Sequence, residues 1–333
     1  NAWVSDVVEV APGELVFSGH TSAFSGAAGD MTLFQLDLDA GFGWHLVHGS
    51  PGVQENNEAV TRLIGGDLVA AGSRSGGAID GYMLRANDAG AWLWDAAVNL
   101  SSKDFFTDVA PTADGGWILC GRTYEGFWDM NILAERRGED GSVIWRVPLG
   151  GGLNEEALAL VEHPTGTVIL AGYQQLIGDD PQGLLTGLGD GGAVLWETLL
   201  PKGTRLADLL VLPNGEILAA GSIWENGPTS SHVYLVRLSA AGAVLEEITS
   251  VSGTGDVVVR TENARIAVLN RTADEVYVFD PAFALDSVMT CGNSAAELTT
   301  LTATSGGGLA AAGILYFGGG YTQWRPYVCR GCE

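Results

Sequence analysis

The sequence predicts an all-β protein, a seven-bladed β-propeller with four-stranded antiparallel blades and a last blade that is incomplete. Two observations predict it. A strand-like segment that ends in a small residue and Gly recurs about every 50 residues, and so does a Gly-rich turn followed by apolar residues and Trp. No stretch has the sustained helical periodicity with caps that a helix requires. Four short strands per repeat of about 40 to 50 residues are typical of propeller blades.

The first recurring segment supplies the blade count. It reads "LVFSG" or "VILAG", and its last residue is Gly19, Gly72, Gly121, Gly172, Gly221 and Gly313, with Asn270 in the sixth repeat. Gly suits a position that needs positive φ or a close backbone approach, and Asn is the usual substitute at positive φ. The seven copies predict one domain with blades at residues 1–53, 54–102, 103–152, 153–201, 202–252, 253–294 and 295–333.

The second recurring segment marks the fourth strand of each blade. Its regular spacing of about 50 residues places Trp44, Trp94, Trp145 and Trp196 at equivalent positions, with Glu246 in the fifth repeat. We expect these indoles to pack between neighbouring blades. In the seventh repeat the corresponding residue would fall beyond position 333, which is why the last blade is expected to be incomplete.

The third repeat shows all four strands. Runs of β-branched and aromatic residues cover 106–112, 117–121, 130–136 and 143–149, and Gly, Asp and Asn separate them. The segment between the second and third strands is the longest connection of the repeat. We therefore expect hairpin turns on one side of the blade and a longer loop on the other.

Composition and charge restrict the partners. The 333 residues carry 48 Gly and a net charge of −24, from 40 acids against 16 bases. A chain this acidic repels phosphate backbones, which makes nucleic acid a poor partner, and it disfavours anionic membrane surfaces for the same reason. No apolar run has the length of a membrane span. No cofactor motif is present, and no His stands in a nucleophile or zinc-protease pattern.

Segments such as "DGGWILCGRT" and "MNILAERRGEDGSVIWRV" resemble the bacterial extracellular delta-sixty and related propeller repeats. The resemblance covers nearly the whole chain and is clearest in the second to fifth repeats. It implies an extracellular, cell-surface or periplasmic propeller. It implies no reaction, because such repeats are scaffolds for many functions.

Aromatic residues gather in the loops between second and third strands, on the face where propellers usually bind. Aromatic side chains in Gly-rich loops suit sugar stacking or protein contact, although some fold back onto the blades instead. The candidate ligand-binding residues are Tyr124, Phe127, Trp128, Tyr173, Trp224 and Tyr316. The favoured function is a non-enzymatic scaffold that binds a protein or polysaccharide through this face.

Acids near the start of the first strands support an alternative. They are Asp6, Glu58, Asp108, Glu156, Asp208, Asp256 and Glu297. Carboxylates at a channel mouth could serve a glycan hydrolase or lyase, for which Asp108 and Asp208 are the candidates. The usual explanation of such acids is that they are solvated or cap turns. Crowded carboxylates also attract Ca²⁺, and Asp179 and Asp180 in "IGDDPQG" are weak candidates for such a site.

Four cysteines are present. Cys120 falls in a second strand and is expected to be a buried thiol. Cys291 lies after the sixth repeat, and Cys329 and Cys332 form "CRGC" near the end. A disulfide between Cys291 and Cys329 or Cys332 would hold the last blade, which suits an oxidising compartment. A Cys329–Cys332 bridge, free thiols or a metal site remain the alternatives.

Overall fold

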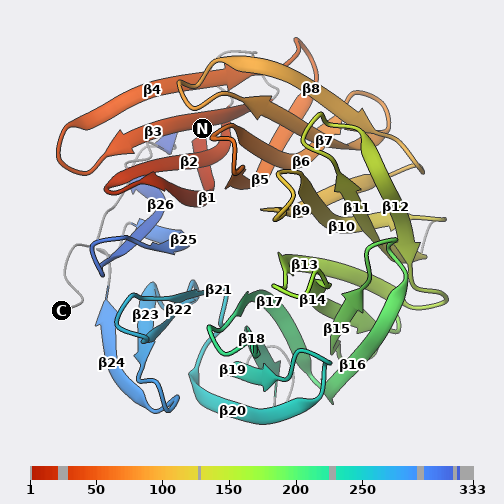
Figure 1. The fold of residues 1–333 in the computed structure, drawn as a ribbon, viewed down its shortest axis with the longest axis vertical. Coiled ribbons are helices and arrows are strands. Elements are labelled where there is room, and N and C mark those ends of the chain that lie inside the picture. Colours follow the sequence, from red (N-terminus) through yellow and green to blue (C-terminus); the bar gives the residue numbers. More distant parts are fainter. Residues whose placement is uncertain are drawn as a thin grey trace. The chain divides into compact units, whose positions relative to one another are not determined.

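A computed structural model of the chain describes residues 2–21, 29–126, 129–224, 230–290, 296–317 and 321–322. Every regular element among them is a β-strand (Figure 1). The fold is a β-propeller whose blades are four-stranded antiparallel sheets with the strands in chain order. None of the described segments forms a helix with the length and hydropathy needed to cross a bilayer.

The strands have the following bounds. The first blade consists of β1 (Ala2–Ala11), β2 (Glu14–Thr21), β3 (Asp30–Asp37) and β4 (Gly41–His48), and the second of β5 (Gln54–Arg62), β6 (Leu68–Ser75), β7 (Ile79–Ala86) and β8 (Trp92–Val98). The third consists of β9 (Asp104–Pro111), β10 (Trp117–Tyr124), β11 (Met130–Arg137) and β12 (Val143–Leu149), and the fourth of β13 (Asn154–Glu162), β14 (Val168–Gln175), β15 (Gln182–Leu188) and β16 (Val194–Lys202). The fifth consists of β17 (Thr204–Val211), β18 (Ile217–Trp224), β19 (Ser231–Leu238) and β20 (Val244–Ser252), and the sixth of β21 (Val257–Arg260), β22 (Ile266–Asn270), β23 (Glu275–Phe279) and β24 (Leu285–Thr290).

The expected count of seven blades is wrong. The described residues form six four-stranded blades, and the seventh repeat forms a three-stranded sheet of β25 (Ala296–Ala303), β26 (Leu309–Phe317) and β27 (Tyr321–Thr322). β27 pairs with only the last two residues of β26. The anchor at Gly313 therefore marks a complete hairpin, but the described residues of this repeat do not make a four-stranded blade.

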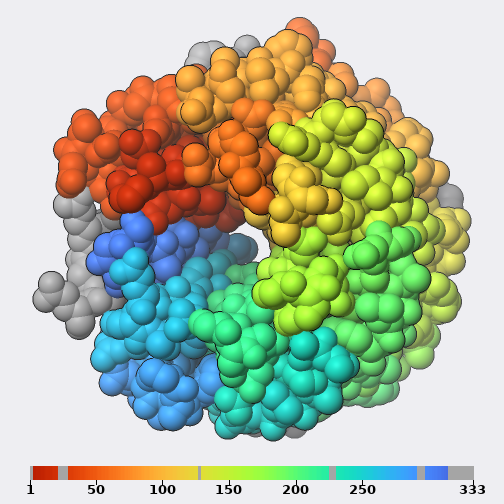
Figure 2. Space-filling model, viewed as in Figure 1, coloured from red at the N-terminus to blue at the C-terminus, as the bar shows by residue number. Residues whose placement is uncertain are grey.

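The chain divides into two compact units. One contains residues 1–99, 259–267 and 274–333, and the other contains residues 100–258 and 268–273. The third, fourth and fifth blades lie wholly in the second unit. In the space-filling view, the yellow-green surface of the third blade adjoins the green surface of the fourth (Figure 2).

The core of the second unit lies between successive blades. Ile118, Cys120 and Trp145 of the third blade pack with Val168 and Leu170 of the fourth. In the fourth blade, residues 168–172 of β14 are all buried, since Val168 and Leu170 face the third blade and Ile169 and Ala171 face the fifth. Burial on both faces explains why the sequence of this strand is continuously apolar rather than alternating.

Glycine is required at the anchor positions because the main chain of the first strand lies very close to them. Gly121 and Gly172 lie beside a bulge in the preceding first strand. A Cβ at Gly121 would overlap the carbonyl oxygen of Phe105, and a Cβ at Gly172 would overlap that of Glu156. Neither glycine has positive φ. Asn270 also lacks positive φ, so the expectation for that residue is wrong. Its Oδ1 instead accepts the backbone N–H of Thr254 at 3.2 Å.

The four repeated tryptophans lie in the fourth strands, as predicted: Trp44 in β4, Trp94 in β8, Trp145 in β12 and Trp196 in β16. Trp145 and Trp196 pack against the core clusters of the second unit. These indoles therefore fill the space between blades.

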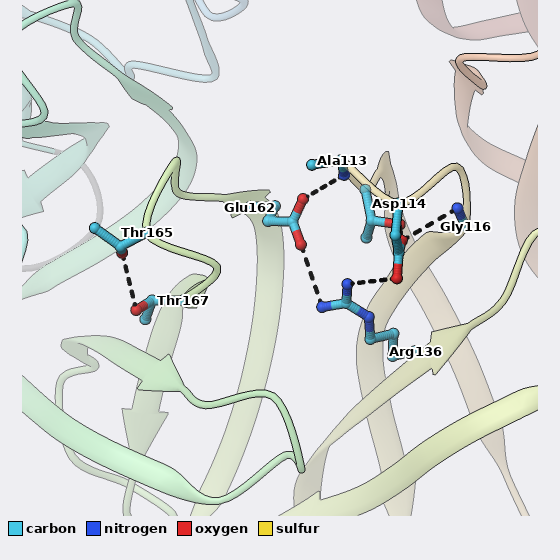
Figure 3. A network of polar contacts seen from close by, with 8 residues as sticks. Ala113, Asp114, Gly116, Arg136, Glu162, Thr165 and Thr167 are labelled. Atoms are coloured by element: carbon cyan, nitrogen blue, oxygen red, sulfur yellow. Dashed lines mark hydrogen bonds and ion pairs between the residues drawn. The ribbon is translucent and has the colours of Figure 1, made fainter.

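An ionic network joins the third and fourth blades at their first hairpin turns (Figure 3). The buried guanidinium of Arg136 lies 3.1 Å from Asp114 of its own blade and 3.2 Å from Glu162 of the next. Glu162 also accepts the backbone N–H of Ala113 at 2.6 Å. The Thr112 hydroxyl and Arg136 hold the pKa of Asp114 below its usual value. Ion pairs therefore link the third and fourth blades at the end that carries these turns.

Candidate functional site

A cavity of about 620 Å³ opens between the third and fourth blades, at the end opposite those turns. The ends of β10 and β14 and the starts of β11 and β13 meet there. Its lining consists of Lys103, Arg122, Tyr124, Met130, Asn154, Glu156, Tyr173 and Gln175. Only Met130 is aliphatic, so the cavity suits a polar ligand.

The lining follows a repeat rule. Arg122 and Tyr124 are the first and third residues after the anchor Gly121, and Tyr173 and Gln175 stand in the same relation to Gly172. Alternate residues of a strand point to the same side, so each second strand directs two side chains into the cavity. The positions one and three residues after each anchor glycine would have identified Arg122 and Gln175 in the sequence. A search for aromatic residues in the loops could not identify them.

Tyr124 belongs to a stack of rings and cations on the side of the third blade. Its ring meets Phe105 edge-on with 6.3 Å between centroids. Lys103 Nζ lies 5.6 Å from the centroid of Tyr124, and Arg122 Cζ lies 4.2 Å from that of Phe105. Cations at these distances are attracted by the ring faces. The stack holds Tyr124 in place at the rim.

Tyr173 is fixed from the side of the fourth blade. Its hydroxyl donates a hydrogen bond of 2.8 Å to Glu156 Oε2. The other oxygen of Glu156 is paired with Arg122 of the third blade. Arg205, at the start of the fifth blade, lies over the Tyr173 ring with Cζ 5.0 Å from the centroid. Glu156, which is buried, is therefore held by both partners and joins the two blades across the floor of the cavity.

The remaining predicted binding residues are not part of this lining. Trp224 lies half-buried at the end of β18 in the fifth blade. Tyr316 lies in β26, where the structure does not describe its side chain. Phe127 and Trp128 fall outside the described residues. Of the six candidates, the structure thus brings Tyr124 and Tyr173 together.

Asp108 and Asp208 hold neighbouring blades together. Asp108 accepts the backbone N–H of Val109 with Oδ1 and that of Leu160, in the next blade, with Oδ2, both at 2.7 Å. Asp208 makes the equivalent bonds to Leu209 and Val258 at 2.8 and 2.7 Å. Both oxygens of each carboxylate are therefore engaged by main-chain donors.

Asp179 and Asp180 lie beside a smaller hollow of about 60 Å³ that shares Gln175 with the cavity. Asp179 is 3.6 Å from the ammonium of Lys202. Within the described ranges, no three His, Cys, Asp or Glu side chains are grouped to hold a metal ion. The calcium site stays a prediction.

Cys120 is a buried thiol in β10, as expected, and burial raises its pKa. Cys291, Cys329 and Cys332 lie outside the described residues, so the pairing of these cysteines also stays a prediction.

The sequence matches no protein-family model and no curated protein. Solved structures do match along most of the chain. The WD40 β-propeller domain of Doa1 is 13% identical, with 94% of this chain and 90% of that one covered and a TM-score of 0.64. A streptogramin B lyase is 11% identical over 93% and 89%, with a TM-score of 0.60. Sqt1 from Chaetomium thermophilum is 15% identical over 98% and 84%, with a TM-score of 0.59.

At such identities the likeness concerns the fold alone. It confirms the β-propeller that the repeat predicts. The particular resemblance to delta-sixty repeats stays a prediction.

Proposed function

We propose that this protein is a secreted or surface-attached binding propeller that holds a glycan in the cavity between its third and fourth blades. The observation that carries the proposal is the pairing of two tyrosine side chains with amides and cations around one cavity of about 620 Å³. Sugar rings stack on aromatic faces and use their hydroxyls to bond amide and charged groups. Tyr124, Tyr173, Asn154 and Gln175 provide both kinds of contact.

The polar lining favours a glycan over an apolar ligand or an apolar protein anchor. Pockets for apolar groups are lined mainly by hydrophobic residues, whereas Met130 is the single aliphatic residue here. The lining is also held in place before any ligand arrives, because Glu156 joins Arg122 and Tyr173. A preorganised site loses less conformational entropy on binding.

Binding is favoured over hydrolysis by the state of the acids. Glu156 is the one acid of the lining, and both of its oxygens already have partners. The structural neighbours favour neither a binding protein nor an enzyme, since they include a WD40 domain and a lyase.

The test is a glycan array probed with the wild-type protein, followed by calorimetry on the best ligands. Tyr124→Ala removes a ring whose contacts are with Phe105 and Lys103 at the rim, and we expect it to weaken binding about tenfold or more. Phe42→Ala is the matched control, because Phe42 is 64% exposed and distant in the repeat order. If no glycan binds, or if Tyr124→Ala binds as wild type, the proposed function is wrong. Capture of a protein with the same dependence on Tyr124 would reassign the partner.

A further inference from the structure

Two cations at the cavity have no acid partner among the described residues. Lys103 and Arg205 are exposed, and the contacts of their charged groups are with the rings of Tyr124 and Tyr173. Nine other basic side chains are paired with carboxylates, namely Arg74, Arg85, Arg122, Arg136, Arg137, Arg146, Lys202, Arg237 and Arg265. Among the other described basic residues, Arg62, Arg260 and Arg271 also lack a carboxylate partner, but none of them lines this cavity. On a chain with 40 acids, two unpaired cations beside one cavity are a local reversal of charge.

The acid inside the cavity does not cancel this charge. Glu156 is paired with Arg122 and accepts the Tyr173 hydroxyl. Lys103 is therefore left as the uncompensated charge of the lining, and Arg205 adds a second one behind Tyr173. Cations without an acid partner gain from a ligand that brings a negative group, since the resulting hydrogen bonds are charge-assisted.

The geometry couples charge to stacking. Lys103 Nζ lies 5.6 Å from the centroid of the Tyr124 ring, and Arg205 Cζ lies 5.0 Å from that of Tyr173. Lys103 lines the same cavity as Tyr124, so a sugar held beside that ring brings its substituents near the ammonium, while Arg205 adds positive charge behind Tyr173. Neutral hydroxyls would bond there weakly, whereas an acidic substituent would form an ion pair.

We propose that the cavity selects glycans whose sugars carry an acidic substituent, a carboxylate or a sulfate, and that Lys103 and Arg205 determine this selectivity. The inference rests on the proposed glycan-binding function and adds the chemical class of the ligand. The net charge of −24 opposes the approach of a long polyanion, so short oligomers are the appropriate ligands.

The experiment compares matched ligands by calorimetry at 0.15 M salt, where the Debye length is about 8 Å. One arm uses oligomers of galacturonate and of alginate, each beside its carboxyl-reduced counterpart. The other arm uses sulfated galactan oligomers beside their desulfated counterparts. The variants are Lys103→Gln with Arg205→Gln, and the control is Arg62→Gln with Arg271→Gln, which removes two exposed charges elsewhere.

We expect the wild type to bind at least one acidic oligomer about tenfold or more tightly than its neutral counterpart. The Lys103→Gln, Arg205→Gln protein should bind both forms equally, while the control keeps the preference. The arm that shows the preference identifies the carboxylate or the sulfate.

Three results would overturn the inference, and they are distinguishable. Equal binding of acidic and neutral oligomers, still sensitive to Tyr124→Ala, would refute selectivity and leave the glycan-binding function intact. A preference that persists without Lys103 and Arg205 would place the acid-binding residues elsewhere. Absence of binding to every glycan would refute the inference together with the proposed function.

Discussion

The indole of Trp196 packs against Gly242, the turn glycine of the next blade, whose φ is +79°. Trp44 meets Gly90 and Trp145 meets Gly192 in the same way, each one blade further along. The recurring Trp of one blade thus packs against the recurring Gly-rich turn of the following blade. The fourth blade thus supplies the indole of Trp196 to one neighbour and the bare main chain of Gly192 to the other.

Gly242→Ala should therefore destabilise the protein for two reasons. A residue with a Cβ is strained at this φ, and the Cβ would overlap the Trp196 ring. We expect a loss of about 2–4 kcal/mol in the free energy of unfolding by urea. Gly52→Ala is the matched control, since Gly52 has a φ of +76° with no atom near its Cβ position, and should lose about 1 kcal/mol. In a Trp196→Ala background, the cost of Gly242→Ala should fall to that of the control; an unchanged cost would mean that the indole is not what the Cβ meets.

Arg136→Met should unpair Asp114 and the largely buried Glu162 together. A buried carboxylate that loses its cation is costly, and we expect a loss of about 2–4 kcal/mol in thermal or urea unfolding. Arg62→Met, on an exposed side chain, should change stability by less than about 0.5 kcal/mol. Equal effects for the two substitutions would refute the bridging role of Arg136.

Glu155→Gln should make the protein more stable at alkaline pH. Burial raises the pKa of Glu155 from 4.5 to about 7, and its Oε2 has no hydrogen-bond partner. The folded state therefore holds the Glu155 proton more tightly than the unfolded chain does. The stabilisation that comes from this proton is complete below pH 4.5 and is lost as the pH rises through about 7. Gln stays neutral, and we expect a gain of about 1–3 kcal/mol over wild type at pH 8 and little difference at pH 4.5.

Asp104, at the equivalent position of the third blade, provides the contrast. Its carboxylate accepts the N–H groups of Leu100 and Ser101 and the hydroxyl of Thr123. Asp104→Asn should therefore destabilise the protein at pH 8, by about 1–3 kcal/mol. If both amide variants lose stability at pH 8, the Glu155 carboxylate has a partner in solution.

Asp208→Ala should lower stability without altering glycan binding. It removes the acceptor of two main-chain donors, one of them in the following blade, and we expect a loss of about 2–4 kcal/mol by calorimetric unfolding. Asp190→Ala, at an exposed turn, is the control. Loss of ligand binding at unchanged stability would instead mean that Asp208 takes part in function rather than in holding the blades together.

The repeat made the blade interior predictable from sequence. Trp145 and Gly121 recur because every interface between blades poses the same packing problem, so their strand positions followed from the period. The number of blades did not follow, because the anchor at Gly313 records a hairpin and a blade requires four strands.

The site was predictable only in part, because it is made by two repeats at once. Tyr124 and Tyr173 could be named from loop composition. The ion pair between Arg122 and Glu156 depends on which residues of successive blades face each other, and the bulge in each first strand shifts that register. The same bulge hides the role of Asp108, whose second oxygen meets a main-chain donor in the next repeat.

The close approach of Gly121 and Gly172 to the first strands has a consequence for engineering. It fixes the position of the second strand against the first strand in these blades. The first and third residues after the anchor therefore reach the cavity from equivalent positions in the two blades. Ser222 and Trp224 hold these positions in the fifth blade. Randomising such pairs while keeping the glycines would give a combinatorial library in which the binding surface varies and the scaffold does not.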